Sequence, residues 1–313
     1  MKPKNRAEIW KQQKYNNSCA WDCFSMLLAT HGVETTALDL VGASHIPYQL
    51  RLHPEEKRLS AGMLVQADGT VNPVLGRFGF HLNSRRTPTI AEYIALARET
   101  LRNGDALITN LKRPDNLPGR HAIVITELRE SCFIGLDPDC RLDRATDYSY
   151  FDVEEIVALD FTEEELVIAA SGEEGFVPLI GVLSPCTPQE PDSPLLQDVF
   201  KRSNDALEFY FSETEDLDFT NGESMQIIYS VIKPIVLDLR TAIEIRDEFL
   251  NQESEIASFL RGFESEILHL RKLVKNGKAI PEEIVNGLRD SLKRSYRILE
   301  EHLSFRAYRN EGK

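Results

Sequence analysis

One cysteine in this chain stands where a protein could build a thiol nucleophile. The three residues before Cys19, at positions 16–18, are all types that commonly cap a helix N-terminus, and an apolar run follows at positions 23–29. This pattern predicts a helix over residues 18–31 that begins within a residue or two of Cys19. A helix N-terminus favours negative charge, and the thiolate is the nucleophilic form of cysteine. The sequence therefore makes Cys19 a candidate nucleophile.

Gln13 lies six residues before Cys19 and could complete an oxyanion site. If a thiolate attacks a carbonyl group, the developing oxyanion needs preorganised hydrogen-bond donors. The side-chain amide of Gln13 and the backbone N–H of Cys19 would supply two of them. The competing interpretation is that Cys19 is simply a small buried residue, because free cysteine is among the most buried residue types.

Two further residues of the same helix receive structural interpretations. Cys23 lies one turn beyond Cys19, and we expect it in the core. The pair could begin a zinc site, but no second pair of Cys or His residues follows at a suitable spacing, so we expect no metal and no other cofactor. Asp22 could hydrogen-bond within the site or complement the positive end of the helix, and we favour the second role.

A base and its orienting group are predicted further along the chain. Two apolar runs, at 118–126 and 132–139, predict a pair of antiparallel strands joined by a hairpin connection over 127–131. His121 opens the first strand and Asp137 closes the second. Those two ends of an antiparallel pair lie on the same edge of the sheet, so a carboxylate can approach an imidazole. The arrangement is typical of a general base held by an acid.

These residues and their spacing resemble the papain-like cysteine peptidase domain with which bacteriocin exporters cut double-glycine leader peptides. The resemblance covers roughly residues 8–160 and rests on Gln13, Cys19, Gly32, His121 and the pair Asp137-Pro138. It implies that Cys19 is the nucleophile and His121 the general base. Asp137 would then orient the base, and Gln13 would bind the oxyanion.

Two positions depart from the pattern of that family. Ala20 stands where the family usually has a glycine after the nucleophile, and Ser18 stands where an aspartate often precedes it. Both departures leave the acid–base residues in place. They weaken the expectation that the chain shares the family's specificity for leader peptides.

Composition excludes several classes of protein. The 313 residues are enough for two domains with cores of their own, and 42% hydrophobic residues is ordinary for a globular chain. The net charge of −14 argues against a nucleic-acid partner. Neither a membrane-spanning apolar run nor the apolar segment of a secretion signal is visible. Five cysteines without a regular framework favour reduced thiols and a cytoplasmic location.

The elements around the candidate residues predict an α+β domain over residues 1–184, with the nucleophile helix packed on an antiparallel sheet. A helix is expected at 90–102, where apolar residues share one face. Segment 41–83 lacks a sustained period and is punctuated by glycine, so we expect irregular structure that borders the substrate cleft. Further strands are expected at 105–109, 156–161, 166–170 and 176–183.

A proline-rich linker at 185–194 separates this papain-like domain from an all-α helical bundle at 195–313. The apolar stripes of the bundle predict burial, and they would serve a docking partner, a homo-oligomer or a cap over the sheet equally well. Helices are expected at 195–211, at 223–250 with a kink at Pro234, at 256–274 with an end at Asn276-Gly277, and from Pro281 onward.

The helical half favours one use of the nucleophile. The architecture resembles bacterial acyltransferases of antibiotic biosynthesis, which take an acyl group from a carrier-protein thioester. The resemblance implies that Cys19 accepts the acyl group and that an amine or peptide substrate releases it as an amide. The first alternative is a cysteine peptidase or amidase, in which water releases the acyl group. The second is a catalytically silent binding module, which would need none of the four candidate residues.

Overall fold

The computed structural model describes residues 6–11, 13, 18–42, 46, 49–53, 58–62, 68–112, 120–139, 158–171, 177–188, 196–213 and separate positions between 262 and 297. The chain divides into two compact units: residues 1–40 with 66–192, and residues 41–65 with 193–313. One break lies within the predicted linker. Residues 41–65, which the sequence analysis placed in the first domain, belong to the second unit.

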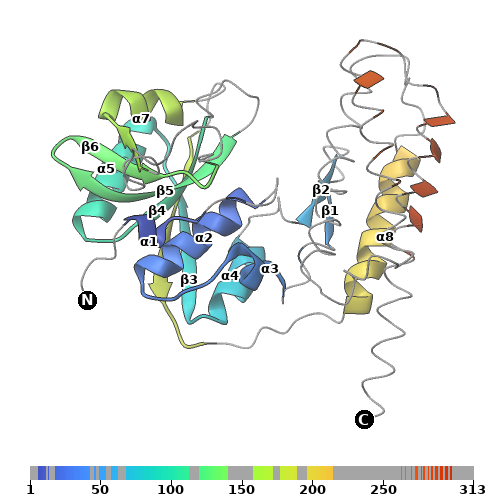
Figure 1. Ribbon diagram of the computed structural model, residues 1–313, viewed down its shortest axis with the longest axis horizontal. Coiled ribbons are helices and arrows are strands. Elements are labelled where there is room, and N and C mark those ends of the chain that lie inside the picture. The colour runs from blue at the N-terminus through green and yellow to red at the C-terminus, as the bar shows by residue number, and fades with distance from the viewer. Residues whose placement is uncertain are drawn as a thin grey trace, which may run out of the picture. The chain divides into compact units, whose positions relative to one another are not determined.

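Unit 1 is built on a six-stranded sheet in which every neighbouring pair is antiparallel (Figure 1). The strand order is β3-β8-β4-β5-β6-β7. The fold class is therefore α+β, as the sequence predicts. The strands are β3 (Phe80–Arg86), β4 (Leu107–Lys112), β5 (Arg120–Arg129), β6 (Cys132–Leu136), β7 (Ala158–Phe161) and β8 (Leu179–Pro185).

Helices cover both faces of this sheet. Helix α2 (Cys19–Thr30) packs on β5 and β4, and its residues from Ala20 to Ala29 are all buried. Figure 1 draws α5 (Ile90–Arg102) and α7 (Glu163–Ala170) together on the other side, where they share an apolar core with the central strands. Unit 1 also contains α1 (Arg6–Ile9) and α4 (Asp68–Gly76), and α3 (Ala37–Gly42) crosses the unit break.

Two predicted helices of unit 1 are confirmed. The first was expected over residues 18–31 and begins at Cys19. The second has the predicted bounds, Ile90–Arg102, because Thr89 caps it and its apolar face turns toward the sheet. Tyr93, Ile94 and Ala97 on that face are all buried.

The strand predicted at 166–170 is wrong, because these residues form the second half of α7. Thr162 is the N-cap of this helix, and its side chain and that of Glu165 form a reciprocal capping box. Leu166 and Ala170 are buried four residues apart, which is the helical spacing. A short apolar run cannot distinguish a strand from a buried helix face, and here the cap decides the outcome.

Other strand bounds are shifted from their predicted positions. Strand β5 continues to Arg129, so the predicted connection shortens to a turn at Glu130 and Ser131, with a φ of 51° at Glu130. The predicted strands at 105–109 and 176–183 become β4 and β8, each displaced toward the C-terminus. The first residues of the predicted linker belong to the sheet, because Pro185 ends β8 and pairs with Phe80.

Unit 2 contains a β-hairpin as well as helices. Strands β1 (Leu50–His53) and β2 (Arg58–Ala61) pair with each other, so the expectation of irregular structure across 41–83 is wrong for the described part of that segment. Helix α8 (Leu196–Glu213) contacts both strands, and the backbone N–H of Leu50 donates to the Ser203 hydroxyl at 3.1 Å. The helix predicted at 195–211 is thus confirmed as α8.

The remainder of the predicted bundle is described only in part. The predicted helix at 223–250, with its kink at Pro234, lies outside the described residues. The N–H of Asn276 donates to the carbonyl groups of Lys272 and Leu273, both at 3.1 Å, and forms a turn where the third helix was predicted to end. Lys293 forms an ion pair of 2.8 Å with Glu208 of α8. In the part of the chain that the structure describes, no helix is both long and apolar enough to cross a membrane.

Candidate active site

Cys19 is the first residue of α2 and is half-buried. Ser18 occupies the N-cap position, but its side chain makes no capping hydrogen bond. The Ser18 hydroxyl instead donates to the Asp22 carboxylate at 2.7 Å, and the backbone N–H of Asp22 donates to the Ser18 carbonyl at 2.8 Å. Both residues are buried. The Asp22 carboxylate thus accepts from the residue that precedes Cys19, a contact compatible with either of the two roles considered for Asp22 from the sequence.

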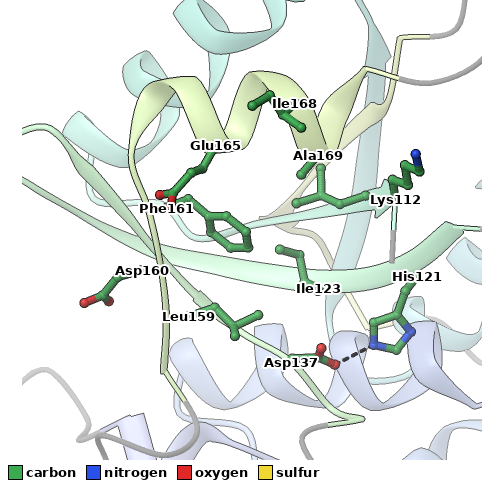
Figure 2. Close-up of a pocket in the computed structure, with 11 residues that line it drawn as sticks. Lys112, His121, Ile123, Asp137, Leu159, Asp160, Phe161, Glu165, Ile168 and Ala169 are labelled. Carbon is green, nitrogen blue, oxygen red and sulfur yellow. Dashed lines mark hydrogen bonds and ion pairs between the residues drawn. The ribbon is translucent and has the colours of Figure 1, made fainter. Parts of the chain in front are cut away.

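His121 and Asp137 meet at the edge of the sheet where β5 begins and β6 ends. The pairing of Val124 with Leu136 sets this register, so that the residue after β6 lies beside the start of β5. Nε2 of His121 and Oδ1 of Asp137 are 2.5 Å apart, and the two side chains point toward one another (Figure 2). The backbone N–H of Asp139 also donates to this carboxylate oxygen, at 2.8 Å. The predicted approach of the Asp137 carboxylate to the His121 imidazole is thus present in the geometry.

The surroundings of His121 favour the charged imidazolium. Burial of the ring opposes the charge and is the largest single effect on its pKa. The hydrogen bond to Asp137, the negative charge of that carboxylate and the nearby Cys19 side chain outweigh that effect and raise the pKa of His121 to about 10. Because Nε2 bonds to Asp137, Nδ1 is the ring nitrogen left for another partner. The imidazole therefore has Asp137 as its bonded partner and Cys19 as a near neighbour.

Cys23 lies in a different environment from Cys19, although it is only one turn away. Its side chain is completely buried. Burial raises the pKa of the Cys23 thiol well above its usual value, and the negative charges of Cys19, Asp22 and Asp137 raise it further. A thiol that stays protonated is a poor nucleophile, so Cys23 is a core residue, as predicted.

The segment before α2 is hydrogen-bonded to the turn that carries Asp137. The indole Nε1 of Trp10 donates to the Asp137 carbonyl at 2.8 Å, and the backbone N–H of Gln13 donates to the Pro138 carbonyl at 2.7 Å. These bonds bring Gln13, Cys19, His121 and Asp137 to one edge of unit 1. Trp10 was missed by the sequence analysis, and its only signal is an aromatic residue with an N–H donor shortly before the candidate site.

A cavity of about 380 Å³ begins at the His121–Asp137 pair and extends toward α7 (Figure 2). Most of its lining is apolar and comes from β4, β5, β7 and α7. Sequence analysis could not find it, because side chains from five separate segments form its walls. The lining residues are Leu111, Lys112, His121, Ile123, Asp137, Leu159, Asp160, Phe161, Glu165, Ile168 and Ala169.

The described residues contain no cluster of three or more His, Cys, Asp or Glu side chains that could hold a metal ion. The arrangement of Cys19, His121 and Asp137 is that of a thiol near a charged imidazole, and an apolar cavity adjoins the imidazole and the carboxylate. In comparisons with known proteins, no family model matches the chain, and neither does any curated protein.

Proposed function

We propose that this protein is a papain-like, cysteine-dependent acyltransferase that forms an amide through an acyl-thioester on Cys19. The observation that carries the proposal is the position of His121, which is hydrogen-bonded to Asp137 and lies close enough to the Cys19 side chain for that group to raise its pKa. A buried imidazole with such partners serves a reacting thiol, whereas a silent binding module would need neither partner. The roles expected from the sequence remain as they were: nucleophile for Cys19, general base for His121, and orienting acid for Asp137.

The reaction proceeds in two balanced steps. The Cys19 thiolate attacks the carbonyl carbon of a thioester, a new C–S bond forms, and the donor thiol leaves with a proton from the His121 imidazolium. An amine then attacks the acyl-enzyme, and the neutral imidazole accepts the proton of the amine as Cys19 leaves as a thiolate. In both steps the backbone N–H of Cys19 and the Gln13 side-chain amide stabilise the oxyanion.

Transfer to an amine is favoured over transfer to water by the cavity beside His121. An apolar cavity of about 380 Å³ gives an organic acceptor a binding surface next to the group that takes its proton. The same residues could also support a peptidase or amidase, in which water is the acceptor. Both activities pass through an acyl-enzyme on Cys19. A peptidase or amidase forms it from an amide, with an amine as the leaving group, and water then releases the acyl group as an acid.

The test is intact-protein mass spectrometry after incubation with a short acyl thioester of N-acetylcysteamine. We expect one acyl adduct on the wild type and none on Cys19→Ala, whereas Cys132→Ala, which removes another half-buried thiol, should keep the adduct. Addition of an amine should then release the acyl group as an amide. Release only as the free acid would favour the hydrolase, and an adduct that survives in Cys19→Ala would contradict the proposal.

We further propose that the helical segment after residue 194 binds the donor and supplies no catalytic group. Phe209 of α8 is 43% exposed, so it offers a position on this segment at which the role can be tested. In the same adduct experiment, Phe209→Ala should raise the Michaelis constant for a carrier-protein donor and spare the N-acetylcysteamine thioester. Equal losses with both donors would show that α8 helps to build the site. The proposal includes a cytoplasmic location, where such thiols stay reduced.

A further inference from the structure

The side chains around the cavity beside His121 are mostly apolar. Aliphatic residues from β4, β5, β7 and α7 line it, together with the phenyl ring of Phe161 (Figure 2). The His121–Asp137 pair lies at one end. Three further charged residues belong to the lining, and the directions of their side chains decide which class of ligand the cavity can bind. These residues are Lys112, Asp160 and Glu165.

None of these three residues places its charge inside the cavity. Asp160 lies between two lining residues of β7, and successive side chains of a strand point to opposite faces, so its carboxylate lies on the far side of the strand (Figure 2). The Glu165 carboxylate is exposed and accepts from the N–H and hydroxyl of Thr162, at 2.8 and 2.9 Å. Lys112 is exposed, and its ammonium group points away from the apolar residues (Figure 2). An ionised group of a ligand would therefore have no partner along these walls.

The apolar wall continues to the surface of the protein at α7. Ile168, which lines the cavity, is 64% exposed, and Leu159 and Phe161 are half-buried. Among the large apolar residues that the structure describes, only Ile168 and Phe209 are exposed. Water thus reaches apolar surface at the cavity that an apolar ligand would cover on binding.

The cavity is placed for the acceptor rather than for the acyl chain. Its walls include His121 and Asp137, but Cys19 is not among the described residues that line it. In the proposed reaction the acyl chain starts at the Cys19 sulfur, whereas the attacking amine must approach the imidazole that takes its proton. A substituent on that amine can extend from the imidazole along the apolar wall.

On this basis, and resting on the proposed acyl transfer at Cys19, we infer that the acceptor is an apolar monoamine whose alkyl chain occupies this cavity. The uncharged amino group attacks the acyl-enzyme, a C–N bond forms, and the C–S bond to Cys19 breaks. The proton of the attacking nitrogen passes to His121. The product is an N-alkyl amide. Diamines and amino acids are poor acceptors, because their second charge would be buried without a partner.

The experiment measures kcat/KM for propylamine, pentylamine and heptylamine with an acetyl thioester of N-acetylcysteamine as donor. We expect kcat/KM to rise about threefold for each added methylene, because the cavity removes most of each group from water. Cadaverine has the carbon chain of pentylamine and a second ammonium group, so it should react about tenfold more slowly than pentylamine. A series that is flat in the wild type, or a preference for cadaverine, overturns the inference.

Ile168→Ala removes part of the apolar wall, and the exposure of this side chain makes misfolding of α7 a minor risk. The variant should lower the ratio of heptylamine to propylamine about threefold and leave the rate with propylamine unchanged. Glu164→Ala is the matched control, because it truncates an exposed side chain of the same helix that does not line the cavity. It should keep the wild-type ratio. An unchanged ratio in Ile168→Ala contradicts the inference.

The alternative occupant is the acyl chain, and the first step of the reaction tests it separately. Rates of adduct formation on Cys19 are compared for acetyl and hexanoyl thioesters without any amine. Ile168→Ala should leave both rates unchanged. If the variant slows only the hexanoyl donor while the amine series stays as in the wild type, the cavity holds the acyl chain and the inference is overturned.

A binding measurement separates this inference from the proposed function. Heptan-1-ol is an uncharged analogue of the amine, and NMR of the protein with labelled isoleucine methyl groups detects its binding without chemistry. Heptan-1-ol should shift the resonances of Ile123 and Ile168 at concentrations where propan-1-ol does not. If these shifts occur but no acyl adduct forms on Cys19, the proposed function fails and the apolar binding site stands. If the adduct forms but the shifts are absent, the inference fails and the acyl transfer stands.

Discussion

The N-termini of α2 and α7 differ in how their first turns are closed. At α7 the Thr162 hydroxyl accepts from the Glu165 N–H at 3.2 Å, and the Glu165 carboxylate accepts from the backbone N–H of Thr162 at 2.8 Å. At α2 the Ser18 side chain makes no such cap and turns to Asp22 instead. The backbone N–H groups in the first turn of a helix have no intrahelical acceptors. Where no capping side chain accepts from these N–H groups, they remain available to bind a reacting anion. The cap of α7 therefore stabilises that helix, whereas the first turn of α2 can take part in a reaction.

The largest expected effect is the difference in alkylation between Cys19 and Cys23. Both thiols lie on α2, but only Cys19 is at its first turn and influences the charge of His121. At mildly acidic pH, iodoacetamide should label Cys19 at least about a hundredfold faster than Cys23, because burial keeps the Cys23 thiol protonated. Peptide mapping by mass spectrometry measures both rates in one sample.

Cys23→Ala is the matched control for this measurement. It should leave the labelling of Cys19 and the acyl transfer largely intact, whereas Cys19→Ala should abolish both. Dominant labelling of Cys23 in the native protein would mean that the start of α2 does not activate a thiol. The difference between the N-termini of α2 and α7 would then not affect thiol reactivity.

The next effect concerns pH and tests whether His121 carries the charge beside Cys19. The pKa of His121 is about 10 in the folded protein against an ordinary value of 6.5, so the folded state holds a proton that the unfolded chain releases. This stabilisation is fully present below pH 6.5 and is lost as the pH rises through about 10. The Tm should fall across that window, as measured by circular dichroism.

His121→Gln removes the titrating group and should flatten the dependence of Tm on pH in the same window. Asp137→Asn keeps the imidazole but removes the negative charge and the acceptor that raise its pKa. It should move the alkaline limit of Cys19 acylation to lower pH. An unchanged pH profile in Asp137→Asn would show that the carboxylate does not set the protonation state of the base.

The smallest effect is expected at the capped helix. Thr162→Ala removes the side-chain cap of α7 and should lower the free energy of unfolding by about 1 kcal/mol. Chemical denaturation measures this change, and Thr162→Ser, which keeps the hydroxyl, should restore most of it. The rate of Cys19 acylation should stay the same in both variants. A loss of acylation in Thr162→Ala would mean that the N-terminus of α7 also contributes to the reaction at Cys19.

The residues that meet at the candidate site were predictable because each rests on a local pattern. The N-cap types before Cys19 predict the start of α2, and antiparallel pairing alone brings the first residue of one strand beside the last of the next. The error at 166–170 had a local remedy, because Thr162 and Glu165 have the spacing of a capping box. That signal lies in the sequence itself, and it favours a helix over a strand for the apolar run that follows.

Other features could not be derived from local patterns. The pairing of Leu50 with Ser203 and the partition of residues 41–65 into unit 2 depend on contacts between distant segments, which no period in the sequence encodes. The cavity likewise exists only after α7 and the ends of four strands have come together.

The bond from Trp10 to the carbonyl of Asp137 joins residues 127 positions apart. Contacts with such a large loop to close form late in folding, after helices and hairpins. During synthesis Cys19 is translated about a hundred residues before His121 and Asp137. If Cys19 is the proposed nucleophile, its thiol has no neighbouring imidazole until the sheet has formed.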